Sequence, residues 1–207
     1  MLLDREKLET LAIGAILHDF GKIKMDSKLL TKADLTAEEV ETLKTHTTLG
    51  FEDLRKRKDL NLVIAHIAFQ HHEHLNGTGY PRRLKEGEIH PLAQIVGIVD
   101  LYDKLTSDHS SVKRIMPHEA CEILIGLADV LYPLEMVRVF LRSIAVYPTG
   151  VTVRLNTSEI GVVVDQNLSM PARPIVRVFD ESEFGSNVVK EYNMVEKRTI
   201  FIQEVLS

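Results

Sequence analysis

The hydrophobic pattern of this chain changes its period near residue 147, and this change constrains the fold more than any other feature. Before that point apolar residues recur at helical spacing, as Leu8 and Leu11 do, so they share one face of an α-helix. After it, runs such as VTVRL alternate between apolar and polar residues, which is typical of strands with one buried face. The sequence therefore predicts a mainly α fold, with a helical bundle over residues 1–146 and a small antiparallel β-rich extension over residues 147–207.

Capping and proline signals divide the first part into helices. Asp4 is a candidate N-cap of the first helix. Thr36 followed by Glu39 has the pattern of a capping box, for a helix predicted to run to about Lys58. Asn61 is expected to start the next helix, which the NGTG turn ends. Three prolines open further predicted helices: Pro91, Pro117 and Pro133.

The second part contains four segments with strand character: VTVRL, IGVVVD, PIVRVFD and TIFIQEVL. Turn residues separate these runs, which predicts four short strands. In the first part, the segment HDFGKIKMDSKLLTKADL interrupts the helical pattern with Gly21 and many polar residues. We expect a loop there.

Composition excludes several classes of protein. The net charge of −5 over 207 residues gives no basic footprint for DNA or RNA. Cys121 is the only cysteine, which excludes an intrachain disulfide and favours a reducing, cytoplasmic location. No apolar run reaches the roughly 18 residues of a membrane span. The apolar stretch near the N-terminus is short and contains Gly14, so we interpret it as a core helix rather than a signal peptide.

Several imidazole and carboxylate side chains lie within apolar helical sequence, in AILHD, KTH, AFQHH and VGIVD. A charge on such a face is costly unless it is paired or coordinates a metal. Ligands that converge from several helices are an established way to build a two-metal site in a bundle. Imidazole and carboxylate together suit Fe, Mn, Zn or Ni, and the lack of a participating cysteine argues against a structural zinc site.

The order of these motifs resembles that of a known family. Residues 4–145 contain, one after another, the motifs HDFGK, KTH, HHE followed by NGTGYP, and VDLYDKLTS. They resemble the HD-GYP family, a branch of the HD metal-dependent phosphohydrolases. The resemblance implies a helical bundle with two or three divalent metal ions, Fe or Mn above all. It also implies hydrolysis of the bacterial second messenger cyclic di-GMP to the linear dinucleotide or GMP. The β-rich tail resembles an extension that some members carry.

The resemblance also assigns roles to residues of this chain. The implied metal ligands are His18, Asp19, His46, His71, His72 and Asp100. A hydroxide that bridges two metals would attack phosphorus in line, with Asp19 as the bridging ligand and Lys22 beside the scissile phosphate. Tyr80 and Pro81 would shape the substrate-side loop.

Two acidic residues have open interpretations. Glu73 would orient a neighbouring ligand histidine through a hydrogen bond, or it is a solvated charge at a helix end. Asp103, one turn after Asp100, would support a ligand or make only a local hydrogen bond. Support of a ligand is the favoured interpretation for Asp103.

The sequence departs from the family pattern in two places. Members have a further helix with another histidine before the HD motif, whereas only 17 residues precede His18 here and none is a histidine. We therefore expect the chain to be truncated relative to the family, and to derive from a longer parent with a sensory or regulatory domain. The uncovered apolar surface would favour a homodimer or domain swap. The family continues R-P-Y-R after VDLYDKLTSD, where this chain has HSSV at residues 109–112.

These observations leave two functions to compare. The leading hypothesis is a metal-dependent cyclic dinucleotide phosphodiesterase, because the HD, HHE and GYP elements are intact. The alternative is a degenerate HD-GYP module that binds a partner or nucleotide without turnover, which both departures favour. Histidine or serine does not replace a bidentate arginine. Metal analysis together with a hydrolysis assay separates the two.

Overall fold

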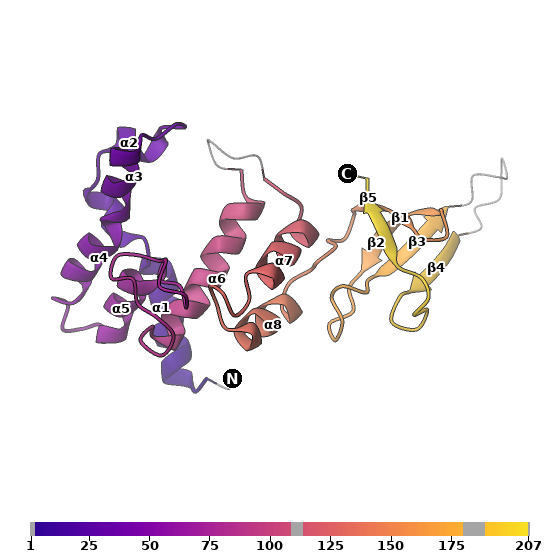
Figure 1. Cartoon of the computed structure of the whole chain (residues 1–207). Coiled ribbons are helices and arrows are strands. Elements are labelled where there is room, and N and C mark those ends of the chain that lie inside the picture. The colour runs from indigo at the N-terminus through magenta and orange to yellow at the C-terminus, as the bar shows by residue number, and fades with distance from the viewer. Residues whose placement is uncertain (1–2, 109–113, 180–188, 207) are drawn as a thin grey trace. The chain divides into compact units, whose positions relative to one another are not determined.

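A computed structural model describes residues 3–108, 114–179 and 189–206. The chain forms two compact units (Figure 1). The first contains Met1–Ile115 and Ile123–Val137, and the second contains Met116–Glu122 and Arg138–Ser207. Each unit is described by itself below.

The helical part begins with the elements that carry the HD and KTH motifs. These are α1 (Arg5–Leu17), the 3-10 helix η1 (Phe20–Lys24), α2 (Ser27–Thr31), α3 (Ala37–Lys44) and α4 (His46–Leu54). The remaining helices are α5 (Leu62–Gln70), α6 (Pro91–Thr106), α7 (Pro117–Gly126) and α8 (Leu134–Arg142).

The predicted helix starts are confirmed. Asp4 accepts a hydrogen bond from the Lys7 backbone and caps α1. Thr36 and Glu39 form a reciprocal capping box at α3, and the Asn61 side chain caps α5. Pro91 occupies the first turn of α6, where its missing N–H costs nothing.

Two helical predictions need correction. The helix expected from Thr36 to about Lys58 is divided into α3 and α4, which join at Thr45. The stretch expected to be a loop contains η1 and α2. Asp26 caps α2 through the Lys28 backbone, so a local capping signal was present within that polar segment.

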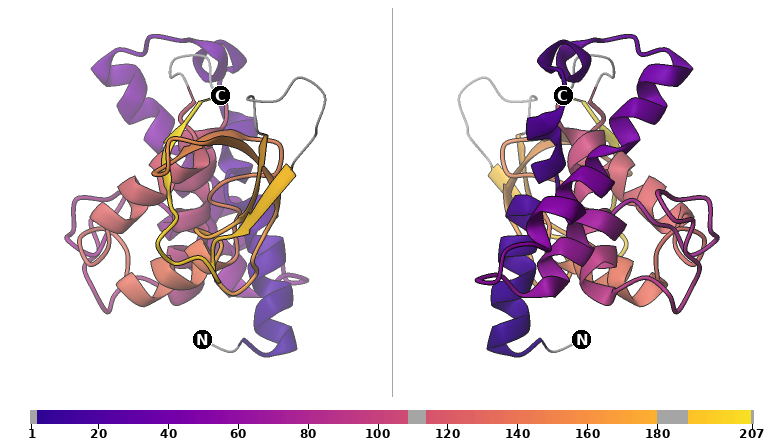
Figure 2. Two further views of the ribbon diagram at one scale, coloured as in Figure 1. Left: turned by 90° about the vertical axis from the view of Figure 1, so that its right-hand side faces the viewer. Right: turned by 90° about the vertical axis from the view of Figure 1, so that its left-hand side faces the viewer.

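The predicted apolar face of α1 is largely exposed. Leu8 is 51% exposed and Ile16 is 80% exposed. The helix instead buries Thr10 and Gly14. A Cβ on Gly14 would lie 2.3 Å from Ile67 Cδ1, so the absence of a side chain allows α1 to approach α5 closely. Figure 2 shows α1 at the edge of the helical unit.

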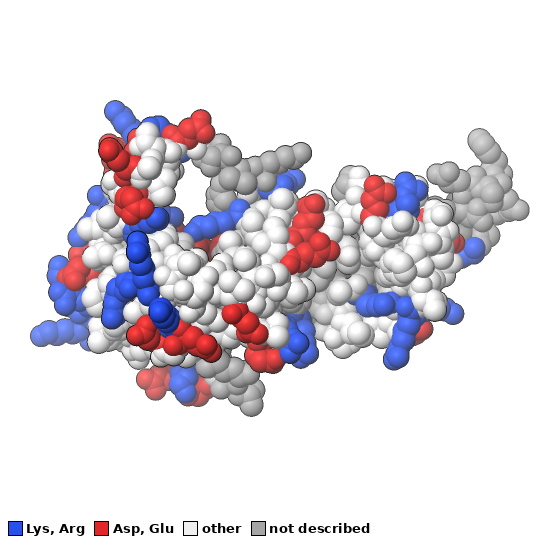
Figure 3. Space-filling model, in the orientation of Figure 1, with Lys and Arg blue, Asp and Glu red and all other residues white. Residues whose placement is uncertain are grey.

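The core of the helical unit lies around α5 and α6. Ile67 packs there with Leu92, Ala93 and Val96. On the other side of α5, Ile64 and Ala68 pack against Leu54. This packing fixes the ends of α4 and α5, which carry histidines. Acidic and basic side chains are interspersed on the face drawn in Figure 3.

The second unit contains an antiparallel sheet, as predicted, but with five strands in its described part rather than four. They are β1 (Thr152–Leu155), β2 (Ile160–Asp165), β3 (Ile175–Phe179), β4 (Val189–Asn193) and β5 (Ile202–Val205), in the order β4-β3-β2-β1-β5. The strand β4 was not predicted, because VKEYN is mostly polar. The sheet packs over a core that includes Val153, Val163 and Met194.

Candidate metal centre

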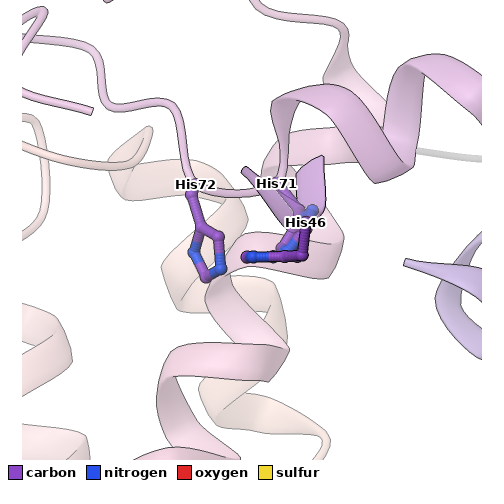
Figure 4. Close-up of side chains that lie close together, drawn as sticks. All are labelled: His46, His71 and His72. Atoms are coloured by element: carbon purple, nitrogen blue, oxygen red, sulfur yellow. The ribbon is translucent and has the colours of Figure 1, made fainter. Parts of the chain in front are cut away.

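Six polar side chains from separate elements meet in the helical unit. His46 Nε2 lies 3.2 Å from Asp19 Oδ1, and His71 Nε2 lies 3.8 Å from the same oxygen. His18 Nε2 lies 3.4 Å from Asp19 Oδ2 and 3.7 Å from Asp100 Oδ1. His72 Nδ1 lies 3.8 Å from Asp100 Oδ2. Figure 4 shows His46, His71 and His72 drawn together.

Glycines allow the elements that carry these residues to approach each other. A Cβ on Gly21, in η1, would lie 1.9 Å from the backbone oxygen of His46. Only glycine therefore allows η1 to pack against the start of α4, which places Asp19 beside His46. Similarly, a Cβ on Gly97 in α6 would lie 2.5 Å from the His71 backbone oxygen.

Three of the histidines are oriented by backbone carbonyls. The Nδ1 of His18 lies 2.7 Å from the Ala15 oxygen, and the Nδ1 of His46 lies 2.7 Å from the Leu43 oxygen. The Nδ1 of His71 lies 3.0 Å from Ala68 O. When Nδ1–H donates to a carbonyl, Nε2 is left with a lone pair. In His46 and His71 that lone pair is on the side of Asp19, whereas His18 directs its Nε2 to Asp19 and Asp100.

Electrostatics separate the histidines into two kinds. Burial lowers the pKa of His71 to about 3, helped by the nearby charge of His18. Burial also lowers the pKa values of His46 and His72. These rings are neutral at pH 7, as metal ligands must be. For His18, burial opposes protonation, but hydrogen bonds to Asp100 and Asp19 outweigh it and raise the pKa to about 10.

The carboxylates are held in their ionised forms. Burial raises the pKa of Asp19, yet hydrogen bonds from His18 and Lys22 outweigh this effect and leave its pKa far below the usual value. Asp100 has a similarly lowered pKa, because hydrogen bonding to His18 and the charge of Lys104 outweigh burial. Ionised carboxylates and neutral imidazoles together form a donor set for a divalent cation.

The residues fit a metal centre. Asp19 Oδ1 is a buried oxygen that finds no hydrogen-bond partner among the described residues, and such a group is costly unless a cation or donor satisfies it. Two sets of donor atoms each lie within 4.8 Å of one another, namely His46, His71 and His72, and His18, Asp19 and His71. The sets share His71, so the cluster can hold divalent metal.

Two lysines border the centre. Lys22 Nζ lies 2.5 Å from Asp19 Oδ2. Lys104 Nζ lies 2.6 Å from Asp100 Oδ2. Lys104 was not among the residues predicted from the sequence. Its spacing of four residues from Asp100 on one helix, which makes the two neighbours on the helix surface, was the available signal.

The GYP loop lies against the histidines. The Tyr80 ring stacks on His72 with 4.6 Å between centroids. Tyr80 and Pro81 also line a pocket of about 260 Å³ with Lys44 and Arg83. Lys44 Nζ lies 5.5 Å from the Tyr80 ring centroid, within reach of a cation–π interaction. The loop thus connects the candidate metal centre to a partly cationic pocket.

Glu73 has different partners from those expected. Its side chain is buried, and its two oxygens accept hydrogen bonds from the backbone N–H groups of Arg82 and Leu84 at 2.7 and 2.8 Å. These bonds hold the chain that follows the GYP motif, so neither orientation of a ligand histidine nor a solvated charge describes Glu73. Asp103 accepts a hydrogen bond from Ser107 Oγ at 2.9 Å. That contact corresponds to the local alternative, not to the favoured support of a ligand.

The fold and the cluster define a helical protein with a centre built for divalent metal. The family model of the HD domain matches residues 1–133, and the chain belongs to this family. A model of the KOW domain associated with the HD domain matches residues 152–207. The resemblance to HD-GYP proteins is confirmed by the relatives described next.

Three relatives place the chain more closely. It is 30% identical over 168 residues to the cyclic di-GMP phosphodiesterase PA4108 of Pseudomonas aeruginosa, with 81% of this chain and 40% of the relative covered. It is 40% identical to a cyclic di-GMP phosphodiesterase of Thermotoga maritima, covering 62% of this chain and 36% of that protein. The solved structure of Bd1817, an HDG"Y"P protein of Bdellovibrio bacteriovorus, has a TM-score of 0.54 and 28% identity, covering 66% of this chain and 43% of that one. The chain thus spans less than half the length of each.

No helix in the described part of the chain is long and apolar enough to cross a membrane.

Proposed function

We propose that this chain is a metal-dependent phosphodiesterase that hydrolyses cyclic di-GMP to the linear dinucleotide or GMP. The observation that carries the proposal is the pair of donor sets that share His71 and flank the unpartnered oxygen of Asp19. The names of the two phosphodiesterase relatives support the choice of a cyclic dinucleotide as substrate.

The centre would hold two divalent metal ions, or three, and these would be iron or manganese. They would supply an activated water and neutralise charge on the phosphoryl oxygens. The ligands would be His18, Asp19, His46, His71, His72 and Asp100. Asp19 has one carboxylate oxygen near His46 and His71 and the other near His18. That geometry supports Asp19 as the residue shared by both metals.

The other residues would bind and orient the substrate. Lys22, which is one-third exposed and hydrogen-bonded to Asp19, would donate to a non-bridging oxygen of the scissile phosphate. Tyr80 stacks on His72 and lines the adjacent pocket, so its ring offers a surface on which a guanine base can stack. Pro81 would help to hold the Tyr80 loop in this position.

The test is hydrolysis of cyclic di-GMP by the full chain after chelation and reconstitution with Fe(II) or Mn(II) under anaerobic conditions. The expected result is metal-dependent formation of linear dinucleotide or GMP, resolved by chromatography. The Asp19→Ala variant serves as the inactive control. Two or more metals per chain without turnover would reject the proposed activity.

A second candidate function is binding without turnover. It is favoured by one observation in the sequence, the replacement of the family's R-P-Y-R by HSSV at residues 109–112, which lie outside the described residues. In that case, cyclic di-GMP would bind to the metal-loaded chain, and no product would accumulate.

The exposed face of α1 supports a proposal about assembly. Leu8 and Ile16 present large apolar side chains to solvent, which favours a homodimer or domain swap. A monomer in light scattering at all accessible concentrations would reject it. We further propose a cytoplasmic location and a longer parent protein with a sensory or regulatory domain. The short span of the chain relative to its relatives supports the latter.

A further inference from the structure

Lys104 and Lys22 have similar contacts at the candidate metal centre. Both ammonium groups contact a carboxylate of the cluster, Lys22 at 2.5 Å from Asp19 and Lys104 at 2.6 Å from Asp100. Both are partly exposed, by 33% and 41%. The two lysines come from different elements, η1 and α6.

Both lysines line one groove of about 500 Å³ that opens beside the candidate metal centre. Its other polar lining residues are His18, Asp19, Asp100 and Asp103, and its apolar lining residues are Leu11, Ala15, Ile95, Val96 and Val99. A groove lined by apolar residues, polar groups and two cations is suited to an anion that carries flat, weakly polar groups. A nucleotide has this chemistry.

Charge balance indicates what Lys104 does when the centre is loaded. In the structure the two lysines neutralise the two carboxylates. A lysine ammonium has three donors and no lone pair, so it cannot ligate a metal. A divalent ion that takes Asp100 Oδ2 would repel the ammonium from that oxygen. Lys104 would then remain tethered at the rim of the groove, where an anion can accept its hydrogen bonds.

We propose that Lys104 is a substrate-binding residue, which pairs with a phosphate oxygen of the cyclic dinucleotide on the α6 side of the centre. This inference rests on the proposed function. In the sequence, Lys104 precedes the segment HSSV, residues 109–112, which supplies no arginine. Its ammonium binds phosphate as a point charge, without bidentate geometry.

The test is equilibrium binding of cyclic di-GMP, by calorimetry at low temperature, to the metal-loaded full chain and its variants. Lys104→Met keeps the alkyl stem and the helix propensity but removes the charge. Its dissociation constant should rise about 10- to 100-fold, as expected for loss of a hydrogen bond to a charged group. Lys104→Arg should stay within about threefold of the original chain, because it keeps the cation.

Two controls separate binding from a structural role. Lys56→Met removes an exposed lysine whose Nζ lies 3.7 Å from Asp53, away from the groove, and should leave both metal content and affinity unchanged. Metal content of Lys104→Met, measured by mass spectrometry, should equal that of the original chain. If Lys104→Met loses metal, Lys104 serves to hold Asp100, and the proposal is overturned.

The outcomes also distinguish this inference from the proposed function. If the original chain binds cyclic di-GMP without turnover, the proposed phosphodiesterase activity is rejected. The change in affinity of Lys104→Met still tests the role of Lys104 in that case. An affinity of Lys104→Met within twofold of the original chain overturns the role of Lys104 while hydrolysis stands. If the metal-loaded original chain does not bind cyclic di-GMP, both proposals are rejected.

Discussion

His46 Nε2 and Asp19 Oδ1 lie 3.2 Å apart, although the two residues belong to different elements. The two atoms do not form a hydrogen bond. His46 has its Nδ1 directed to the Leu43 carbonyl, so the neutral ring presents a lone pair to a carboxylate oxygen. Two acceptors placed face to face repel each other unless a cation or proton lies between them. This contact is the clearest physical sign that the cluster is built for metal.

Removal of Asp19 should abolish metal binding. Among the described residues, Asp19 is the carboxylate that approaches His18, His46 and His71 together, so we expect Asp19→Ala to lose all bound metal and hydrolysis. His18→Ala should have the same effect. Metal content after reconstitution measures this, with the exposed Asp59→Ala variant as the control. Retained turnover in Asp19→Ala or His18→Ala would refute the assignment.

Gly21 should be required for the approach of η1 to α4. Alanine there would place a Cβ 1.9 Å from the His46 carbonyl oxygen, so the backbone must move and separate Asp19 from His46. We expect Gly21→Ala to lower the free energy of unfolding by about 2 kcal/mol or more and to weaken metal affinity. In Gly126→Ala the new Cβ meets nothing within 4 Å, so this control should change stability by less than about 1 kcal/mol. Equal effects of the two substitutions would contradict this explanation.

Glu73→Gln should destabilise the GYP loop without removing metal. The glutamine keeps only one acceptor for the two backbone amides of Arg82 and Leu84. Loss of a hydrogen bond to a buried charged group costs about 2 kcal/mol, which urea denaturation of the metal-loaded chain can detect. Metal stoichiometry should stay unchanged. A stable variant that binds less metal would instead indicate that Glu73 acts on a ligand histidine.

The stability of the metal-free chain should peak near pH 6.5. Below that pH, the unfolded chain takes up protons that His46, His71 and His72 resist when folded, because burial lowers their pKa values. Each such proton reduces the free energy of unfolding by about 1.4 kcal/mol per pH unit. The pKa of His18 is raised to about 10, so its stabilising contribution is complete below about pH 6.5 and is lost as the pH rises through 10.

Urea denaturation in the presence of a chelator, from pH 4 to pH 9, measures this profile. The carboxylates do not move the maximum, because the stabilisation from the lowered pKa values of Asp19 and Asp100 is lost only below their unfolded value near 3.8. A stability that rises steadily from pH 6.5 to pH 9 would contradict the ion pair of His18.

The sequence predicted those parts of the fold that depend on local signals. The caps at Asp4, Thr36 and Asn61 were predictable because a side chain satisfies a backbone group only a few residues away. The strand β4 was not, because its polar residues carry no alternation, and its pairing with β3 is a tertiary effect. The burial of Gly14 in place of Leu8 likewise depends on close contact with Ile67, which no local pattern records.

The candidate site was predicted as a set of residues, but its geometry was not. The resemblance to HD-GYP motifs indicated His18, His46 and His71, which the structure brings together. The partners of Glu73 could not be predicted, because Arg82 and Leu84 donate through the backbone, which no side-chain motif encodes. Lys104 was missed because a lysine on a helix surface is usually solvated, and its contact with Asp100 becomes informative only when Asp100 is known to face the centre.

The most direct test of the metal centre is anomalous scattering from a crystal of the chain reconstituted with Fe(II) or Mn(II). We predict two peaks about 3.5–4 Å apart, both within coordinating distance of Asp19. His71, which belongs to both donor sets, should lie beside them. A single peak elsewhere in the molecule, or imidazoles of His18, His46 and His71 that point away from a common centre, would contradict the account.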